Sequence, residues 1–256
     1  MSNVDTRKVI VIVGAGFGGL HCTLLLGRQF LKFDLVSKYR VLLVDRNDYH
    51  TYMPTLYEAA TTSDEIASQL HLKSIITFPI HESIEGLPVE FFRTRVTEID
   101  LPAGDIHTET GTVIHFNYLV LASGSQTNYF GIPGMHERSL PLKTFIDALR
   151  IREHLMTLAE DSEQEHLQIV VGGGGSAGVE LAGEVKAWLN SIHYRLPNTV
   201  SIIEAAPTVL SSFDERVARR VTRRLEKLGI KLLTNEKMSS VSDGVVTLAS
   251  GKEIPF

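Results

Sequence analysis

The stretch VIVIVGAGFGG, residues 9–19, joins an apolar run to a glycine-rich turn and decides the fold. A second stretch, IVVGGGGSAG at residues 169–178, repeats this plan. Asp45 and Glu204 each close a further apolar run, and each follows the first glycine of its turn by 31 residues. One G-x-G-x-x-G turn is weak evidence. Two of them, each in a strand–turn–helix–strand context with an acid at one spacing, predict two nucleotide sites in an α/β protein.

The residue types in each turn fit the binding of a dinucleotide. The first glycine makes the tight turn, the second lets the backbone approach a pyrophosphate, and the third lets the helix pack on the strand. The helix N-terminus offers free N–H groups to the phosphates, and the acid accepts hydrogen bonds from an adenosine ribose. These roles fall on Gly14, Gly16, Gly19 and Asp45 in the first copy, and on Gly173, Gly175, Gly178 and Glu204 in the second.

The composition narrows the class of protein. The chain has 256 residues, of which 43% are hydrophobic, and a formal net charge of −5. These values favour a globular protein of one or two domains with no nucleic-acid partner. Its single cysteine, Cys22, cannot form an internal disulfide. No apolar run reaches the roughly 18 residues of a membrane span, and the N-terminus lacks a signal-peptide pattern, so the expected compartment is the cytoplasm.

One cluster of positively charged residues contrasts with the negative net charge of the chain. Its cations alternate with apolar residues at helical spacing, so we favour the solvated face of an amphipathic helix over a site for an anionic partner. The cluster consists of Arg216, Arg219, Arg220, Arg223, Arg224 and Lys227.

The patterns also predict the order of the elements. The first half is expected to contain a strand at 8–13, a helix at 17–30, a strand at 40–45, an irregular stretch at 46–63, a helical segment at about 64–76, and strands near 89–99, 104–109, 112–116 and 118–122. After a turn at 131–134 and a helical connector at 143–160, the second half is expected to have strands at 167–171, 199–204, 230–234, 236–242 and 244–249, and helices at 176–190 and 214–228.

The repeat extends beyond the glycine turns, because residues 110–116 align with residues 250–256. In the first copy the strand at 118–122 follows at once, whereas the second copy stops at Phe256. We therefore expect the second sheet to lack its last parallel strand and the chain to be incomplete.

Five blocks of sequence carry a resemblance to a known family. They are VDRNDYH at 44–50, PTLYEAAT at 54–61, LVLASGS at 119–125, LPLKT at 140–144 and GVELAGE at 178–184. With the two turns, they resemble the two-dinucleotide-domain flavoprotein reductases, and among these the type II NADH:quinone oxidoreductases. The likeness covers nearly the whole chain. It implies two tandem Rossmann-like domains, an FAD-binding one at 1–134 and an NADH-binding one at 135–256, and family members continue beyond this end point.

The resemblance implies a function and a set of site residues. NADH would deliver a hydride to flavin N5, and the reduced flavin would pass electrons to a quinone. The expected FAD-binding residues are Gly14, Gly16, Phe17, Gly18, Gly19, Asp45, Arg46, Val96, Ala122, Ser123 and Gly124. The expected NADH-binding residues are Gly173, Gly175, Ser176, Gly178, Glu180 and Glu204.

Two of these residues carry a further expectation. Glu204 would accept from a ribose 2′-OH and repel a 2′-phosphate, and residues 205–207 supply no arginine, so NADH is preferred over NADPH. By the resemblance, Glu180 lies near the nicotinamide and flavin rings as the candidate catalytic residue. A purely structural carboxylate interacting with the helix dipole is the equally weighted alternative.

The expected partners are NADH and a quinone or another small electron acceptor. A homodimer stays open, and contact with the cytoplasmic face of a membrane is expected only through the part of the protein beyond residue 256. No metal site is expected, because the histidines lack ligand-like spacing.

Two other enzyme classes are excluded. Residues 174–178 match the G-x-S-x-G turn of α/β-hydrolases, but no histidine follows Glu204 to complete a triad. With Cys22 alone, redox chemistry of a cysteine pair is excluded. Two alternatives stay open: an NAD(P)H-dependent flavin reductase with a soluble or protein acceptor, and a nucleotide-binding chain without turnover.

Overall fold

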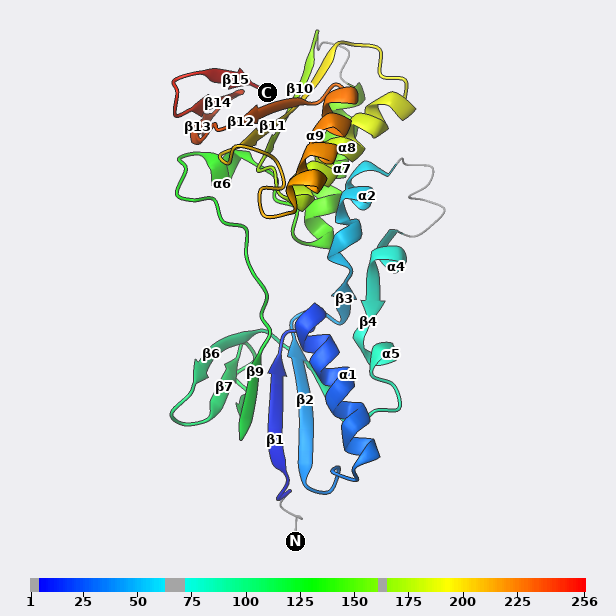
Figure 1. Ribbon diagram of the computed structural model, residues 1–256. Helices are drawn as coiled ribbons and strands as arrows, with labels where there is room; N and C mark the ends of the chain where they lie inside the picture. The colour runs from blue at the N-terminus through cyan, green and yellow to red at the C-terminus, as the bar shows by residue number, and fades with distance from the viewer. Residues whose placement is uncertain (1–4, 63–71, 161–164) are drawn as a thin grey trace. The chain divides into compact units, whose positions relative to one another are not determined.

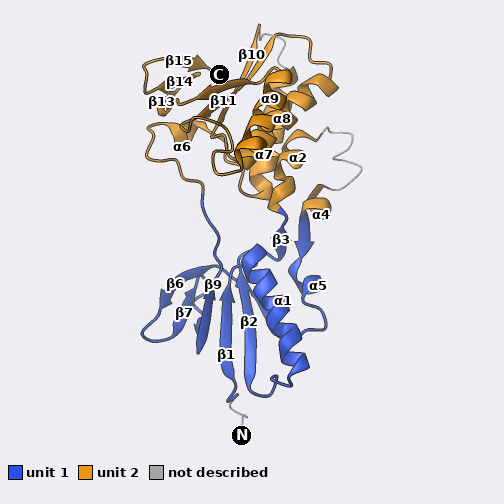
Figure 2. Cartoon of the chain, in the orientation of Figure 1, with its two compact units in different colours: residues 1–52, 77–126 blue, residues 53–76, 127–256 orange. Residues whose placement is uncertain are grey.

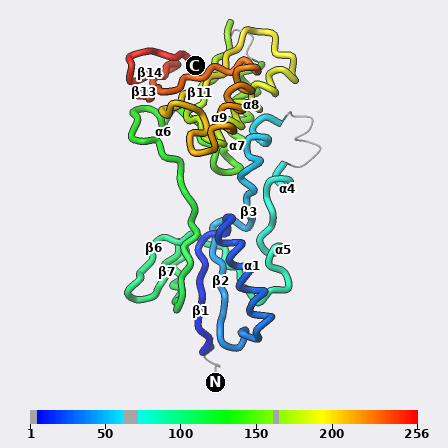
Figure 3. Tube along the Cα trace, in the orientation of Figure 1, coloured from blue at the N-terminus to red at the C-terminus, as the bar shows by residue number. Residues whose placement is uncertain are grey.

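The computed structural model describes residues 5–62, 72–160 and 165–256. The chain forms two compact units, which Figure 2 distinguishes by colour. The first consists of residues 1–52 and 77–126, and the second of residues 53–76 and 127–256. Figure 3 follows the course of the chain through each of them.

The first unit contains β1 (Lys8–Val13), α1 (Phe17–Lys32), β2 (Tyr39–Asp45), β3 (Tyr49–Thr51), β4 (Thr77–Pro79), α5 (Ile80–Ser83), β5 (Val89–Arg93), β6 (Val96–Asp100), β7 (Asp105–Thr108), β8 (Val113–His115) and β9 (Tyr118–Leu121). The second unit contains η1 (Met53–Thr55), α2 (Leu56–Thr61), α4 (Leu72–Ile76), α6 (Met135–Arg138), α7 (Phe145–Glu160), β10 (Leu167–Gly172), α8 (Ser176–Ser191), β11 (Asn198–Glu204), α9 (Glu215–Lys227), β12 (Lys231–Thr234), β13 (Met238–Ser242), β14 (Val245–Leu248) and β15 (Glu253–Pro255).

A parallel sheet with strand order β5-β2-β1-β9 forms the centre of the first unit (Figure 1). Ile12 and Leu43 on one face pack in a core with Phe30 of α1. Val11 on the other face packs in a core with Ile106 of the meander β6-β7-β8. Because both faces are covered, the strands read as continuous apolar runs rather than alternating ones.

The second unit repeats this plan with the strand order β10-β11-β12. Ile202 packs in one core with Val185 of α8 and Leu225 of α9. Ile203 packs with Leu248 of the meander β13-β14-β15. In the described chain β10 pairs with β11 alone, whereas its counterpart β1 pairs with both β2 and β9.

The two meanders confirm the repeat that the sequence predicts. Each has an irregularity in its first strand, between Val96 and Glu98 and between Met238 and Ser240. In the first copy the N–H of Phe116 donates to the carbonyl of Gly104 at 2.8 Å. In the second the N–H of Phe256 donates to the carbonyl of Gly244 at 2.9 Å. The fold of residues 250–256 therefore follows that of residues 110–116.

The other expected strands and helices outside the segment 46–76 are confirmed, with ends that differ by at most two residues. The strand expected near 89–99 is instead two strands, β5 and β6, which belong to different sheets. The expectation of an irregular stretch at 46–63 is wrong in part, because β3, η1 and α2 lie there. β3 pairs with β4, which comes much later in the sequence, so no local sequence pattern predicts β3. Of the helical segment expected at about 64–76, residues 72–76 form α4 and residues 64–71 lie outside the described ones.

Helix α2 explains why residues 53–76 pack with the second unit. Leu56, Ala59 and Ala60 are buried in the same core as Val179 and Ala182 of α8. The side chain of Arg152 on α7 also donates from Nε to the carbonyl of Thr62 at 2.8 Å. The two compact units therefore differ from the two domains expected at 1–134 and 135–256. Those two domains stay a prediction.

Candidate nucleotide-binding sites

The first glycine turn joins β1 to α1. Gly14 has a φ of +101°, and its N–H donates to the carbonyl of Val44 at 2.8 Å. A Cβ at Gly14 would lie 2.3 Å from the carbonyl oxygen of Ala122, and one at Gly19 would lie 1.7 Å from that of Gly14. The chain itself therefore requires the first and third glycines of the motif.

Gly16, the second glycine, has no such requirement. A Cβ placed there would have no neighbour within 4 Å, and its φ of −69° is open to any residue. Gly16 is the N-cap of α1, which receives no side-chain cap and has no acidic residue in its first turn. The first N–H groups of this helix thus keep their capacity to donate to an anion approaching over Gly16.

Asp45 holds the turn from the end of β2. Its Oδ2 accepts from the N–H of Ala15 at 2.6 Å, and its Oδ1 accepts from the N–H of Asn47 at 2.8 Å. Each carboxylate oxygen has a second lone pair, so these two bonds leave acceptor capacity for a ligand hydroxyl.

The other residues expected at the first site lie at different distances from this turn. Ala122 is next to it, because its N–H donates to the carbonyl of Val13 at 2.8 Å and its Cβ borders Gly19. Ser123 and Gly124 follow and are exposed. Phe17, Gly18 and Arg46 are exposed too, and Val96 is half-buried at the start of β6.

The second turn, between β10 and α8, has the same design. Gly173 has a φ of +103°, and its N–H donates to the carbonyl of Ile203 at 2.8 Å. A Cβ at Gly178 would lie 2.1 Å from the carbonyl oxygen of Gly173, whereas one at Gly175 would have no neighbour within 4 Å. Gly175 is the uncapped N-cap of α8, and Ser176 opens the helix with its side chain exposed.

Glu204 takes the place of Asp45 at the second turn. Its Oε2 accepts from the N–H of Gly174 at 2.6 Å, and its Oε1 accepts from the N–H of Ala206 at 2.7 Å. The longer side chain needs more room, since a Cβ at Gly174 would lie 3.1 Å from Cγ of Glu204 and 2.9 Å from Cγ1 of Val209. The corresponding residue of the first turn is Ala15, which faces the shorter side chain of Asp45.

His50, which the sequence reasoning missed, also holds the first turn. Its Nδ1 lies 2.9 Å from the carbonyl oxygen of Ala15, and its ring is edge-on to that of Phe17 with the centroids 4.9 Å apart. A carbonyl accepts only, so Nδ1 carries the hydrogen. Ala15 is thereby fixed on both sides, by His50 at its carbonyl and by Asp45 at its N–H. No spacing rule could have found His50, because β3 reaches the turn through tertiary contacts.

A second missed group is the side chain of Thr94, just after β5. It is 3% exposed, and its Oγ1 has no hydrogen-bond partner in the described part of the chain. The N–H of Thr94 donates to the carbonyl of Asp45 at 2.9 Å, which places this hydroxyl close to the end of β2. A buried hydroxyl without a partner is costly, so it is a group that a ligand at this edge could satisfy.

Glu180 lies one turn into α8 and faces a residue from the first half of the sequence. Burial raises the pKa of the Glu180 carboxyl. Burial, and then the negative charges of Glu180, Glu58 and Glu184, raise the pKa of Tyr57 on α2. Tyr57 of α2 therefore lies within reach of the charge of Glu180 on α8.

A family model decides to which group of proteins these paired turns belong. The model of the pyridine nucleotide-disulphide oxidoreductases matches residues 8–256. The chain belongs to the pyridine nucleotide-disulphide oxidoreductase family. This membership confirms the fold class expected from the sequence, with two Rossmann-like units of the two-dinucleotide-binding flavoprotein type.

Curated relatives confirm the finer resemblance, and solved structures share the fold. A type II NADH:quinone oxidoreductase of Staphylococcus saprophyticus is 26% identical over 236 residues, which are 88% of this chain and 56% of the relative. NDH2 from Plasmodium falciparum, solved in complex with NADH, matches with a TM-score of 0.77 at 23% identity, over 97% of this chain and 53% of that one. The sulfide:quinone oxidoreductase from Aquifex aeolicus matches with a TM-score of 0.77 at 20% identity, over 97% of this chain and 57% of that one.

The chain thus spans about half the length of the curated relatives that it matches. Within the described residues, no group of histidine, cysteine or acidic side chains is placed to hold a metal ion. No helix in the same part of the chain is long and apolar enough to cross a membrane.

Proposed function

We propose that this chain is the nucleotide-binding part of an NADH-dependent flavoprotein oxidoreductase, with FAD at the Gly14 turn and NADH at the Gly173 turn. The electron acceptor proposed for the whole protein is a quinone. The order of the two cofactors follows the resemblance to type II NADH:quinone oxidoreductases. Contact of the whole protein with a membrane is proposed on the same resemblance.

The observation that carries the proposal is the open space over the second glycine of each turn. The backbone conformation or the packing of the chain accounts for the first and third glycines, but no contact among the described residues accounts for Gly16 or Gly175. A pyrophosphate that contacts the backbone directly would account for both. The uncapped N-termini of α1 and α8 supply the N–H donors for it.

The acids at the ends of β2 and β11 fit the recognition of a ribose. In each turn the carboxylate is held by two backbone N–H groups and keeps lone pairs free. At the second turn the charge of Glu204 would repel a 2′-phosphate, and Ala205, Ala206 and Pro207 offer no cation. This arrangement supports NADH as the donor over NADPH.

A bound flavin would supply the redox chemistry, which is the uptake of a hydride from NADH and the delivery of electrons to a quinone. The residues of the chain bind and orient. Gly16 and Gly175 admit the pyrophosphates, Asp45 and Glu204 hold the riboses, and His50 fixes the peptide that joins Ala15 to Gly16. Glu180, which lies near the second turn because it is early in α8, is the candidate catalytic residue on the resemblance.

Absorbance spectroscopy tests the proposal on the chain as it stands. The purified chain, supplied with FAD and freed of excess, should show the visible bands of oxidised flavin. Anaerobic NADH should bleach these bands. A chain that stays colourless in the presence of FAD would contradict the FAD site, and bands that persist with NADH would contradict hydride transfer in this chain.

Two single substitutions test whether FAD binds at the first turn and NADH at the second. Gly16→Ala should leave a colourless protein, because the added methyl group occupies the approach of the FAD pyrophosphate. Gly175→Ala should stay yellow and no longer bleach with NADH. Gly183→Ala on α8 is the control, since its methyl group also enters open space but far from the cap. If Gly183→Ala loses both the yellow colour and the bleaching with NADH, the substitutions damage the fold in general rather than a single site.

A further inference from the structure

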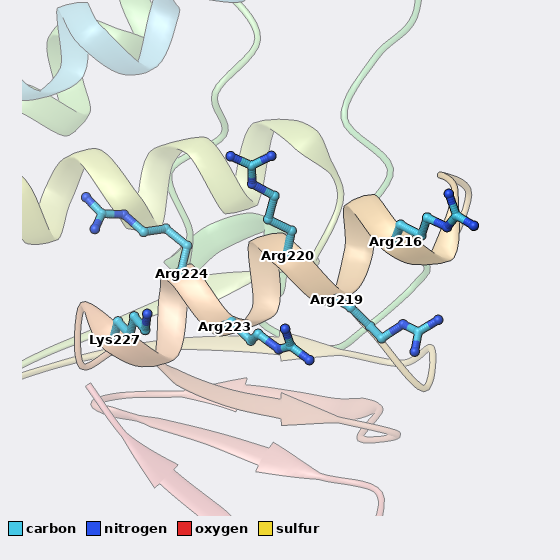
Figure 4. A pocket seen from close by; sticks show the side chains of 6 residues that line it. All are labelled: Arg216, Arg219, Arg220, Arg223, Arg224 and Lys227. Atoms are coloured by element: carbon cyan, nitrogen blue, oxygen red, sulfur yellow. The ribbon is translucent and has the colours of Figure 1, made fainter.

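Six cationic side chains on α9 line one open pocket, which Figure 4 shows from close by. The pocket has a volume of about 630 Å³. Its lining residues are Arg216, Arg219, Arg220, Arg223, Arg224 and Lys227. None of them belongs to the glycine turns, and Glu204 is not among them, so the pocket is separate from the proposed NADH site.

The helix places these cations on a single face. At about 100° per residue, the six positions fall within an arc of about 140°. Ala218 and Leu225, which are 2% and 3% exposed, lie on the opposite side and pack into the core of the second unit. The cationic side chains fan out from this solvent-facing arc (Figure 4). The expectation of an amphipathic helix is therefore confirmed.

The charges of this face are poorly compensated within the chain. Only Arg219 has a carboxylate partner among the described residues, with Nη2 at 3.2 Å from an oxygen of Glu215. Along the helix, cations follow one another at intervals of three and four residues, an arrangement that destabilises a helix through repulsion. A chain with a net charge of −5 thus concentrates positive charge at one place, where a bound anion would relieve the repulsion.

The lining also indicates the chemical class of the anion. Its polar groups are all cationic, without an acidic side chain among them, so it selects for negative charge. Arginine forks match phosphate oxygens with paired hydrogen bonds. We propose that the arginine face of α9 binds a compact anion that carries several phosphates.

Isothermal titration calorimetry of the whole chain with inorganic tripolyphosphate tests this proposal. The wild-type chain should bind at one site in dilute salt. The double variant Arg220→Gln, Arg224→Gln should bind at least about tenfold more weakly, because it removes two charge-assisted donors. The control Arg28→Gln, Lys32→Gln removes two exposed cations four residues apart on α1 and should bind as the wild type does. Equal weakening in both would overturn the site.

Two further measurements test the role of the guanidinium groups and the source of the anion. The double variant Arg220→Lys, Arg224→Lys keeps the positive charge but loses the paired N–H donors of the guanidinium groups. Weaker binding of tripolyphosphate by this variant supports the proposal, and unchanged binding overturns it. Vesicles of phosphatidylcholine with phosphatidic acid distinguish a lipid headgroup from a free anion. If the vesicles bind through α9 while tripolyphosphate produces no heat, the pocket for a compact soluble anion is overturned. Melting temperatures without ligand show that each variant is folded.

Discussion

Asp45 and Glu204 act first on the protein's own backbone. Each carboxylate joins a glycine turn to the residue two positions beyond itself. Hydrogen bonds to a charged acceptor are among the stronger ones in proteins, so these acids stabilise the turns before any ligand binds. A change at either position therefore affects stability as well as affinity.

Asp45→Asn should lower the local stability of the first unit by about 1–3 kcal/mol. The amide keeps one acceptor oxygen, so the N–H of Ala15 or of Asn47 would face an NH₂ group. Native-state hydrogen exchange at the amides of β1 and β2 measures this change. Asp48→Asn is the control, since its exposed pair with Arg93 at 3.2 Å should contribute less than about 1 kcal/mol. Equal losses in both variants would refute the role of Asp45.

Glu180 gives a prediction about pH. Its pKa in the folded state is raised above the ordinary value of 4.5, so from pH 4.5 upward the folded state holds the proton more firmly than the unfolded state. Rising pH then removes stability. At neutral pH Glu180→Gln should melt at a higher temperature than the wild type, and the two should converge below pH 4.5. A variant that melts lower at neutral pH would contradict this sign.

At the scale of elements, α2 shows how a short helix depends on its neighbours. It has six residues, too few for a stable helix in isolation. Burial of Leu56, Ala59 and Ala60 against the second unit supplies the stability that local propensity does not. The same contacts place Tyr57 where its pKa responds to Glu180.

Leu56→Ala should therefore weaken the second unit, although Leu56 lies in the first half of the sequence. Leu56 is 2% exposed, and its truncation should cost about 2–5 kcal/mol. Trp188, the only tryptophan, lies in the same core and reports its unfolding by fluorescence in urea. Leu20→Ala, a buried leucine of α1 in the first unit, should leave this transition in place. If it shifts the transition equally, the assignment of α2 to the second unit is wrong.

At the scale of the whole molecule, each unit has its own sheet and its own cores. A ligand that binds one folded unit stabilises that unit by mass action. Because Trp188 reports on the second unit alone, the two proposed nucleotide sites can be separated in the intact chain.

NAD⁺ at one hundred times its dissociation constant should raise the free energy of unfolding reported by Trp188 by about 2.7 kcal/mol. The reason is that the proposed second site exists only in the folded unit. Urea titrations with and without NAD⁺ measure this increase. The Gly175→Ala variant should show none of it, and the same increase in that variant would place NAD⁺ elsewhere.

The sequence by itself determined the two sets of parallel strands, both glycine turns and the acid of each turn. These features depend on neighbours along the chain: apolar runs form buried strands, and glycine admits the φ of +101° and +103° that the turns need. Only the tertiary structure decided that His50 fixes Ala15, that Thr94 is buried beside Asp45, and that α2 packs on α8. Those contacts join residues that are far apart in the sequence. Their energy comes from packing and burial, so no local periodicity of the sequence predicts them.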